Sequence, residues 1–278
     1  MMRQFILDSI SPVDMISWAL TALFFLGAAA INGGDLTLSF IGAGGVVMTM
    51  FLVGASVEVM IETLKDVKGI GTLTGFLTNG PEAIVVVVGL ATGDILFAAS
   101  TPLGSNFMNP ILLVLAALLT GRLMLTLKVH PAYTVSCLVV TATFAGGFYL
   151  VDRAHYLFWV IAVVIASVYF FLRRMPEQEE ETDDIAISKS WFFPALLCLI
   201  GAGYALDPVV SFASEQSMAP KGVIGFIVLS TLTSWPEFKS TMALLRRGNG
   251  VAAVLNIVVS NITNLWLACV GVVVYLMM

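Results

Sequence analysis

Two short stretches of this sequence share one polar pattern and decide how the fold is interpreted. Residues 77–82 read Leu-Thr-Asn-Gly-Pro-Glu, and residues 232–237 read Leu-Thr-Ser-Trp-Pro-Glu. The first stretch is followed by Ser-Asn-Phe-Met-Asn at 105–109, and the second by Ser-Asn-Ile-Thr-Asn at 260–264. A single offset of 155 residues relates both pairs without a gap. Polar motifs that recur at one spacing indicate an internal repeat.

The composition around this repeat is that of a membrane protein. Hydrophobic residues make up 59% of the 278 residues and charged residues 11%, and the mean hydropathy is +0.98. Soluble domains carry about 25% charged residues. The apolar runs are continuous rather than alternating, which predicts an all-α polytopic membrane protein. This composition argues against a soluble enzyme, no nucleophile–base pair or histidine cluster suggests another kind of enzyme, and no basic patch suggests nucleic acid.

A transmembrane helix needs about 20 mainly apolar residues. By this measure the chain holds about nine spans, at about 14–31, 37–63, 68–90, 94–119, 130–150, 154–172, 190–213, 219–244 and 250–277.

The charges of the connecting loops predict the orientation. With loops assigned alternately to two sides, ten lysines and arginines share the side of the N-terminus and two lie on the other side. Because positive residues collect in the cytoplasm, we expect a cytoplasmic N-terminus and an external C-terminus, in a bacterial inner (plasma) membrane. Cleavage within residues 1–30 would remove the first span only. With a cytoplasmic N-terminus, the third span runs outward and the eighth runs inward. The repeats are therefore inverted, as in secondary transporters.

Two glutamates lie deep inside these spans, where a carboxylate is costly and usually functional. They are Glu82 and Glu237, one in each copy of the repeat. Residues four apart share a helix face, so further oxygen-bearing side chains accompany them, namely Thr78, Ser105, Asn109, Thr233, Ser260 and Asn264. Pro81 and Pro236 lack an N–H and leave the carbonyls of Leu77 and Leu232 as further candidates. Such oxygens suit a hard cation such as calcium.

These motifs resemble the two alpha-repeats of the sodium/calcium exchanger (calcium:cation antiporter) superfamily. One repeat helix of that family carries Gly-Thr-Ser-Leu-Pro-Glu, and the next carries Gly-Asn-x-x-Gly-Ser-Asn-x-x-Asn/Asp. The resemblance implies that Glu82 and Glu237 are the central cation ligands and that the other six side chains complete the sites. Asn264 stands where these exchangers often have aspartate, and Lys239 is an added charge. The family has five spans per repeat, whereas the second half here has three.

The sequence therefore predicts an antiporter with an inverted-repeat core. It would exchange a divalent cation, calcium above others, for sodium or protons at one shared site, by alternating access and without a cofactor. The alternatives are a non-transporting or regulatory membrane subunit derived from an antiporter, and a cation channel. The expected partners are the lipid bilayer and inorganic cations, with a homo-oligomer as one way to cover the shorter half. The expected domains are an extra N-terminal helix (1–36), a first repeat (37–172, motif 72–112), an acidic cytoplasmic loop (173–189) and a shortened second repeat (190–278, motif 227–267).

Two further expectations concern charged residues outside the motifs. The acidic run that begins at Glu177 has no apolar residues beside it, which favours a solvated loop. Lys239 lies inside a span, and a buried lysine needs a partner. Glu58 and Lys239 each lie five residues from the cytoplasmic end of their spans, so we expect these two side chains to pair.

Overall fold

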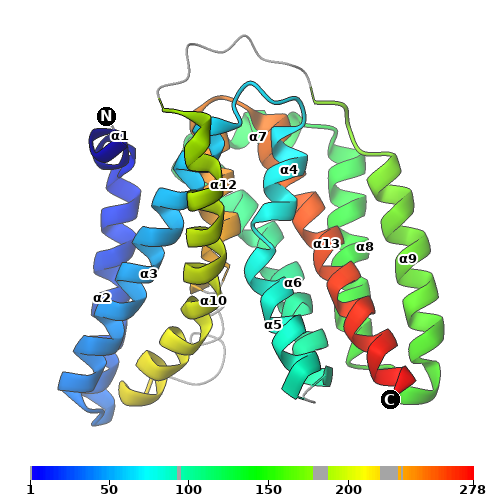
Figure 1. Ribbon diagram of the computed structural model, residues 1–278, viewed down its shortest axis with the longest axis horizontal. Coiled ribbons are helices and arrows are strands. Elements are labelled where there is room, and N and C mark those ends of the chain that lie inside the picture. The colour runs from blue at the N-terminus through cyan, green and yellow to red at the C-terminus, as the bar shows by residue number, and fades with distance from the viewer. Residues whose placement is uncertain (1, 93–94, 178–186, 220–230, 233) are drawn as a thin grey trace. The chain divides into compact units, whose positions relative to one another are not determined.

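The computed structural model describes residues 2–92, 95–177, 187–219, 231–232 and 234–278, and in these residues the chain forms helices and no strand. The helices, shown in Figure 1, are α1 (Met2–Ser9), α2 (Pro12–Asn32), α3 (Leu36–Thr63), α4 (Ile70–Leu77), α5 (Gly80–Thr92), α6 (Ile95–Leu119), α7 (Leu123–Lys128), α8 (Pro131–Phe148), α9 (Tyr156–Leu172), α10 (Phe192–Gln216), α12 (Trp235–Arg246) and α13 (Gly250–Met277). Two short 3-10 turns, η1 (Arg153–His155) and η2 (Lys189–Trp191), precede α9 and α10.

Within the described residues, eight helical segments are long and apolar enough to cross a membrane. They coincide with eight of the nine predicted spans, which confirms an all-α polytopic membrane protein. Most of the remaining predicted span, at 219–244, lies outside the described residues, and α12 covers its end.

The helices form two compact units that are each discontinuous in sequence. The first unit contains residues 1–65 and 182–239, and the second contains residues 66–181 and 240–278. These units follow packing, whereas the predicted domains follow the sequence repeat.

In the first unit, α3 and α10 pack side by side and run in opposite directions (Figure 1). Small residues permit this approach, as is common between membrane helices. A Cβ atom at Gly42 of α3 would lie 2.8 Å from the Cα atom of Ala213 of α10. Near the end of this contact, the N–H of Asp35 donates to the carbonyl of Gln216, at 2.9 Å. The additional helix α2 also packs on α3.

In the second unit, α13 is the central helix and contacts α4, α5, α6, α8 and α9. Its direction is opposite to that of α6. Leu103, near the start of α6, clusters with Leu265 of α13, whereas Leu113, further along α6, clusters with Val254. Two helices that cross a membrane in opposite directions fit an inverted repeat.

Helix boundaries recur at the offset of the sequence repeat. Helix α5 begins at Gly80 and α12 at Trp235, each directly after a turn residue. These two starts differ by 155 residues, the offset that relates the motifs. The duplicated sequence thus breaks its helices at corresponding positions, which supports the proposed repeat.

Glu177 departs from the expectation of a purely solvated acidic loop. Its carboxylate accepts hydrogen bonds from the N–H groups of Gly71 (2.6 Å) and Thr72 (2.9 Å) and from the Thr72 hydroxyl (2.7 Å). These N–H groups belong to the first turn of α4 and have no partner inside the helix. A negative charge at this end also stabilises the helix dipole. Glu177 is therefore the N-terminal cap of α4, while residues 178–186 of the run lie outside the described part.

Removing this cap is expected to destabilise the protein modestly. In Glu177→Ala the two N–H groups lose their acceptor, at a cost of about 1–2 kcal/mol, as for other lost caps. The measurement is thermal unfolding of the purified protein in detergent, with the exposed Glu215 as control position. Glu215→Ala should unfold with the wild type. Equal unfolding temperatures for Glu177→Ala and wild type would show that solvent replaces the cap without loss.

Candidate cation-binding site

The first copy of the motif lies where one membrane span is interrupted. Helix α4 ends at Leu77, α5 begins at Gly80, and the two residues between them form a turn (Figure 1). Pro81 occupies the first turn of α5, where its missing N–H requires no partner. The interruption leaves the carbonyl of Leu77 at the C-terminal end of α4, as expected for a candidate ligand. It also brings polar backbone groups to the middle of a span, which membrane proteins tolerate where the backbone is buried in protein.

Thr78 and Glu82 are both buried at this interruption. Thr78 is 1% exposed and Glu82 is 7% exposed. Glu82 lies in the first turn of α5, where the helix dipole favours a negative charge. Within the described part of the chain, the hydroxyl of Thr78 and Oε2 of Glu82 have no hydrogen-bond partner. Since buried polar atoms are nearly always satisfied, these two oxygens are candidates for binding an ion or water.

Two hydrogen bonds that the side-chain amide of Asn109 donates hold this amide in one orientation. Its Nδ2 donates to Oγ of Ser260, at 3.2 Å, and to Oδ1 of Asn261, at 2.9 Å. Asn261 has no spare donor to reverse this bond, because its own Nδ2 donates to Thr141. Oδ1 of Asn109 is therefore left as a buried acceptor, without a hydrogen-bond partner among the described residues. An oxygen fixed in this way is suited to a cation and not to an anion.

Asn264 lies on α13 and is fully buried. Neither atom of its amide has a hydrogen-bond partner within the described ranges. Thr78, Glu82, Asn109 and Asn264 thus all belong to the second unit and all carry an unsatisfied buried oxygen. Four of the predicted ligands are thus among the residues at which this unit leaves oxygens without partners, and Asn106, which was not predicted, is another.

Ser260, a predicted ligand, also makes hydrogen bonds within the protein. Its hydroxyl donates to Oδ1 of Asn79, at 3.1 Å, and accepts the bond from Asn109. The Nδ2 of Asn79 in turn donates to the carbonyl oxygens of Gly75 and Ser260. Ser260 therefore links the interrupted span to α13 and orients Asn109. It keeps a lone pair for a ligand, but its main contacts are within the protein.

The remaining predicted residues are placed as follows. Glu237 belongs to the first unit, lies in the first turn of α12 and is fully buried. Ser105 is half-buried on α6, and Leu232 is buried. Thr233 lies outside the described residues.

A reciprocal contact joins the two copies of the Ser-Asn motif. Nδ2 of Asn106 donates to the carbonyl of Asn261, at 3.1 Å, and Nδ2 of Asn261 donates to the carbonyl of Asn106, at 3.4 Å. The two residues are related by the repeat offset. When residue i contacts j as j contacts i, a two-fold relation connects the elements. This reciprocal pair is what a local two-fold relation between α6 and α13 produces.

Sequence reasoning missed the residues that support the ligands. Asn79 replaces the serine of the family motif and was not proposed as a functional residue, yet it carries three hydrogen bonds in this network. Asn256 donates to the hydroxyls of Ser240 and Thr241, which joins α13 to α12 within the second unit. A polar residue at a helix interruption was the available signal for Asn79.

The oxygen atoms of the candidate ligands are chemically consistent with a hard cation as a transported substrate. Hydroxyl, amide and carboxylate oxygens are the ligands that calcium and sodium prefer. In the described part of the chain, no group of three or more His, Cys, Asp or Glu side chains gathers as a transition-metal site would. Zinc and copper sites are built from nitrogen and sulfur ligands of a kind this set does not contain.

Comparison with known proteins agrees with this reading of the motifs. Residues 190–278 match the family model for sodium/calcium exchanger proteins. No sequence among the curated proteins matches the chain. The fold is similar to that of the sodium–calcium exchanger NCX_Mj, in a crystal soaked with 100 mM Na⁺ and 10 mM Sr²⁺, at a TM-score of 0.54 and 15% identity, covering 85% of this chain and 83% of that one. In 10 mM Na⁺ without Ca²⁺ the same exchanger matches at a TM-score of 0.51 and 17% identity, with the same coverage.

These matches confirm the resemblance on which the sequence analysis relied. The family model covers residues 190–278, which is about a third of the chain, and the structural likeness covers 85% of the chain. At this identity the structural likeness establishes the fold, which is that of an exchanger with interrupted membrane helices.

Proposed function

We propose that this protein is a secondary-active cation antiporter that exchanges a divalent cation, with calcium as the favoured substrate, for sodium or protons. The observation that carries the proposal is the set of buried oxygens without partners at Thr78, Glu82, Asn109 and Asn264. Burying an unsatisfied polar atom is costly, so four such residues at one motif favour a site that binds a hydrated or dehydrated cation. The family match of residues 190–278 adds support from sequence.

Glu82 and Glu237 supply the charge in this proposal. Dehydrating a divalent cation is expensive, and buried carboxylates offset that cost. Asn109 and Asn264 add neutral oxygens. Two carboxylates balance one divalent cation, two monovalent cations or two protons, so the competing ions replace one another on the same ligands.

The proposed movement involves α3 and α10. Both belong to the first unit, whereas the predicted ligands Thr78, Glu82, Asn109 and Asn264 belong to the second. Small displacements of α3 and α10 would open access to the ligands from alternate sides of the membrane. The N-terminus is proposed to be cytoplasmic and the C-terminus external, from the distribution of lysine and arginine.

This charge count predicts an exchange close to electroneutral. A third positive charge would have no carboxylate to balance it, and an unbalanced charge in a site with little water is costly. One divalent cation should therefore exchange for two monovalent ions. Calcium flux measured in proteoliposomes at imposed membrane potentials should vary little with voltage. A steep voltage dependence, with three or more sodium ions per calcium, would show that other groups supply charge.

The experiment that tests the proposed function is uptake of ⁴⁵Ca²⁺ into proteoliposomes with and without a counter-ion inside. An antiporter should take up calcium only when the vesicles contain sodium or are acidic inside. Uptake that needs no counter-ion would indicate a channel. Absence of both uptake and calcium binding would indicate a non-transporting subunit.

A further inference from the structure

Lys239 is a buried lysine that lies two residues after the proposed ligand Glu237. It is 2% exposed. Its Nζ donates to both carboxylate oxygens of Asp14, each at 2.8 Å. Asp14 belongs to α2, the additional N-terminal helix, and is 3% exposed. The main partner of this lysine therefore comes from the helix that precedes the repeats.

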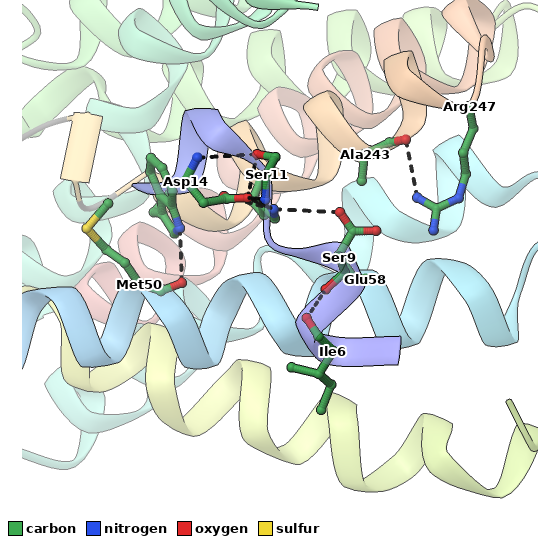
Figure 2. Close-up of polar contacts among 10 residues, drawn as sticks. Ile6, Ser9, Ser11, Asp14, Met50, Glu58, Ala243 and Arg247 are labelled. Atoms are coloured by element: carbon green, nitrogen blue, oxygen red, sulfur yellow. Dashed lines mark hydrogen bonds and ion pairs between the residues drawn. The ribbon is translucent and has the colours of Figure 1, made fainter. Parts of the chain in front are cut away.

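The carboxylate of Asp14 is held in place by the start of its own helix. Ser11 is the N-terminal cap of α2, and its N–H and hydroxyl donate to Oδ2 of Asp14, at 2.8 and 2.6 Å. Figure 2 shows Ser11 and Asp14 together at this helix end, with Glu58 of α3 nearby. A carboxylate in the first turn of a helix, with two donors and an ammonium, is stabilised in its charged form.

Helix α3 provides the second surface around the lysine. Oε1 of Glu58 lies 3.6 Å from Nζ of Lys239, so the expected pair exists, but at a longer distance than the pair with Asp14. The lysine stem lies along α3 at Gly54, where an added Cβ would be 3.4 Å from Cε. Lysine stems commonly cover apolar helix surface in this manner. The contacts of Lys239 with α2 and α3 are all within the first unit.

The first copy of the repeat shows which residue occupies the position that corresponds to Lys239. Subtracting the offset of 155 residues from Lys239 gives Ile84, an apolar residue that is 36% exposed. The first copy thus presents an apolar side chain at the surface, whereas the second copy has a charge at the corresponding position. In the second copy, α2 supplies the Asp14 carboxylate to that position.

We propose that Asp14 masks the charge of Lys239, so that the ammonium does not weaken cation binding at Glu237. The inference rests on the proposed function, because it needs Glu237 to bind the transported cation. Two residues along a helix correspond to about 200° of rotation, so Glu237 and Lys239 leave α12 on opposite sides. Their charges are then on the order of 10 Å apart, a distance at which charges still interact in a medium with little water. Asp14 is a positioning residue that offsets this repulsion.

The proposal makes a specific prediction for variants of Asp14. In Asp14→Asn the ammonium loses its closest carboxylate and keeps the longer contact with Glu58, so calcium binding should weaken roughly tenfold or more. Asp14→Asn combined with Lys239→Met removes both charges and should restore binding to within about twofold of wild type. If Asp14 only anchored α2 through its ion pair with Lys239, the double variant would bind calcium as weakly as Asp14→Asn, because it also lacks that ion pair. Lys239→Met alone should bind calcium at least as tightly as wild type.

The experiment is equilibrium binding of ⁴⁵Ca²⁺ to the purified full chain in detergent, with maximal flux in proteoliposomes as a second readout. The matched control is Asp8→Asn, since Asp8 is exposed and bonds only locally to Gln4 in the described structure, and it should bind as wild type. The expected result is a change in the dissociation constant of Asp14→Asn with a smaller change in maximal rate, and recovery in the double variant.

Three results would overturn the inference while leaving the proposed function intact. They are wild-type affinity in Asp14→Asn, a double variant as weak as the single one, and tenfold weaker binding in Lys239→Met. The last result does not depend on whether Asp14→Asn folds. Wild-type protein that neither binds nor exchanges calcium would instead overturn the proposed function.

Discussion

Glu82→Gln is expected to abolish counter-ion-dependent calcium flux while the protein stays folded. Glutamine keeps the shape of the side chain and removes the charge that offsets dehydration of the cation. Glu82 is buried in the first turn of α5, and its Oε2 has no hydrogen-bond partner in the described structure, so this oxygen is available to a cation. We expect flux to fall by a factor of about 100 or more, since a buried charge contributes several kcal/mol.

The measurement is ⁴⁵Ca²⁺ exchange in proteoliposomes, together with thermal unfolding in detergent. Glu237→Gln should behave as Glu82→Gln does. The exposed Glu215 provides the matched control, and Glu215→Gln should exchange at the wild-type rate. Wild-type flux in Glu82→Gln would show that the charge of this glutamate is not needed for transport. Loss of both flux and folding would show that the glutamate is needed for stability.

The second large effect is expected at the contact between α4 and α13. A Cβ atom at Gly71 would lie 2.3 Å from the carbonyl oxygen of Ala252 and 2.4 Å from its Cα atom. Both are backbone atoms of a fully buried residue and cannot turn aside as a side chain could. Gly71→Ala must therefore push α4 away from α13, at a cost of about 3 kcal/mol or more. Because α4 leads into Thr78 and Asn79, the displacement should also disrupt the hydrogen bonds that orient Asn109.

Gly147→Ala is the matched control for this contact. Gly147 lies in α8, and an added Cβ there would meet nothing within 4 Å. Alanine is a better helix former than glycine by about 1 kcal/mol, so this variant should be as stable as wild type or slightly more. We expect Gly71→Ala to show a much lower unfolding temperature and little flux. Similar unfolding of Gly71→Ala and Gly147→Ala would contradict the close packing of α4 on α13.

The sequence predicted the parts of the fold that depend on local pattern. Continuous apolar runs gave eight spans that the described structure contains. The duplicated motif predicted helices that break at corresponding positions, and α5 and α12 begin 155 residues apart. Of the predicted side chains, Thr78, Glu82, Asn109 and Asn264 carry buried oxygens without partners in the described ranges. These features follow from periodicity, proline and repeated polar residues, which act locally.

The sequence could not predict contacts that depend on which helices are neighbours. Depth in the membrane correctly suggested Glu58 for Lys239, but depth does not say that α2 lies beside α12 in the first unit with Asp14 directed at the ammonium. The same limit applies to Glu177. The composition of its acidic run predicts a solvated loop, but the Glu177 carboxylate caps α4. The sequence also does not identify Asn79 as a supporting residue, because its bond to Ser260 depends on how α13 packs on the interrupted span.

The central claim is that a counter-ion gradient drives calcium transport through this protein, and uphill accumulation tests it most directly. Proteoliposomes would be loaded with sodium or acidified inside, placed in ⁴⁵Ca²⁺ without the counter-ion, and held at zero membrane potential with potassium and valinomycin. We predict that internal calcium rises above the external concentration and falls again when the gradient is collapsed with an ionophore. Calcium that only equilibrates, at the same rate with and without the gradient, would contradict the account.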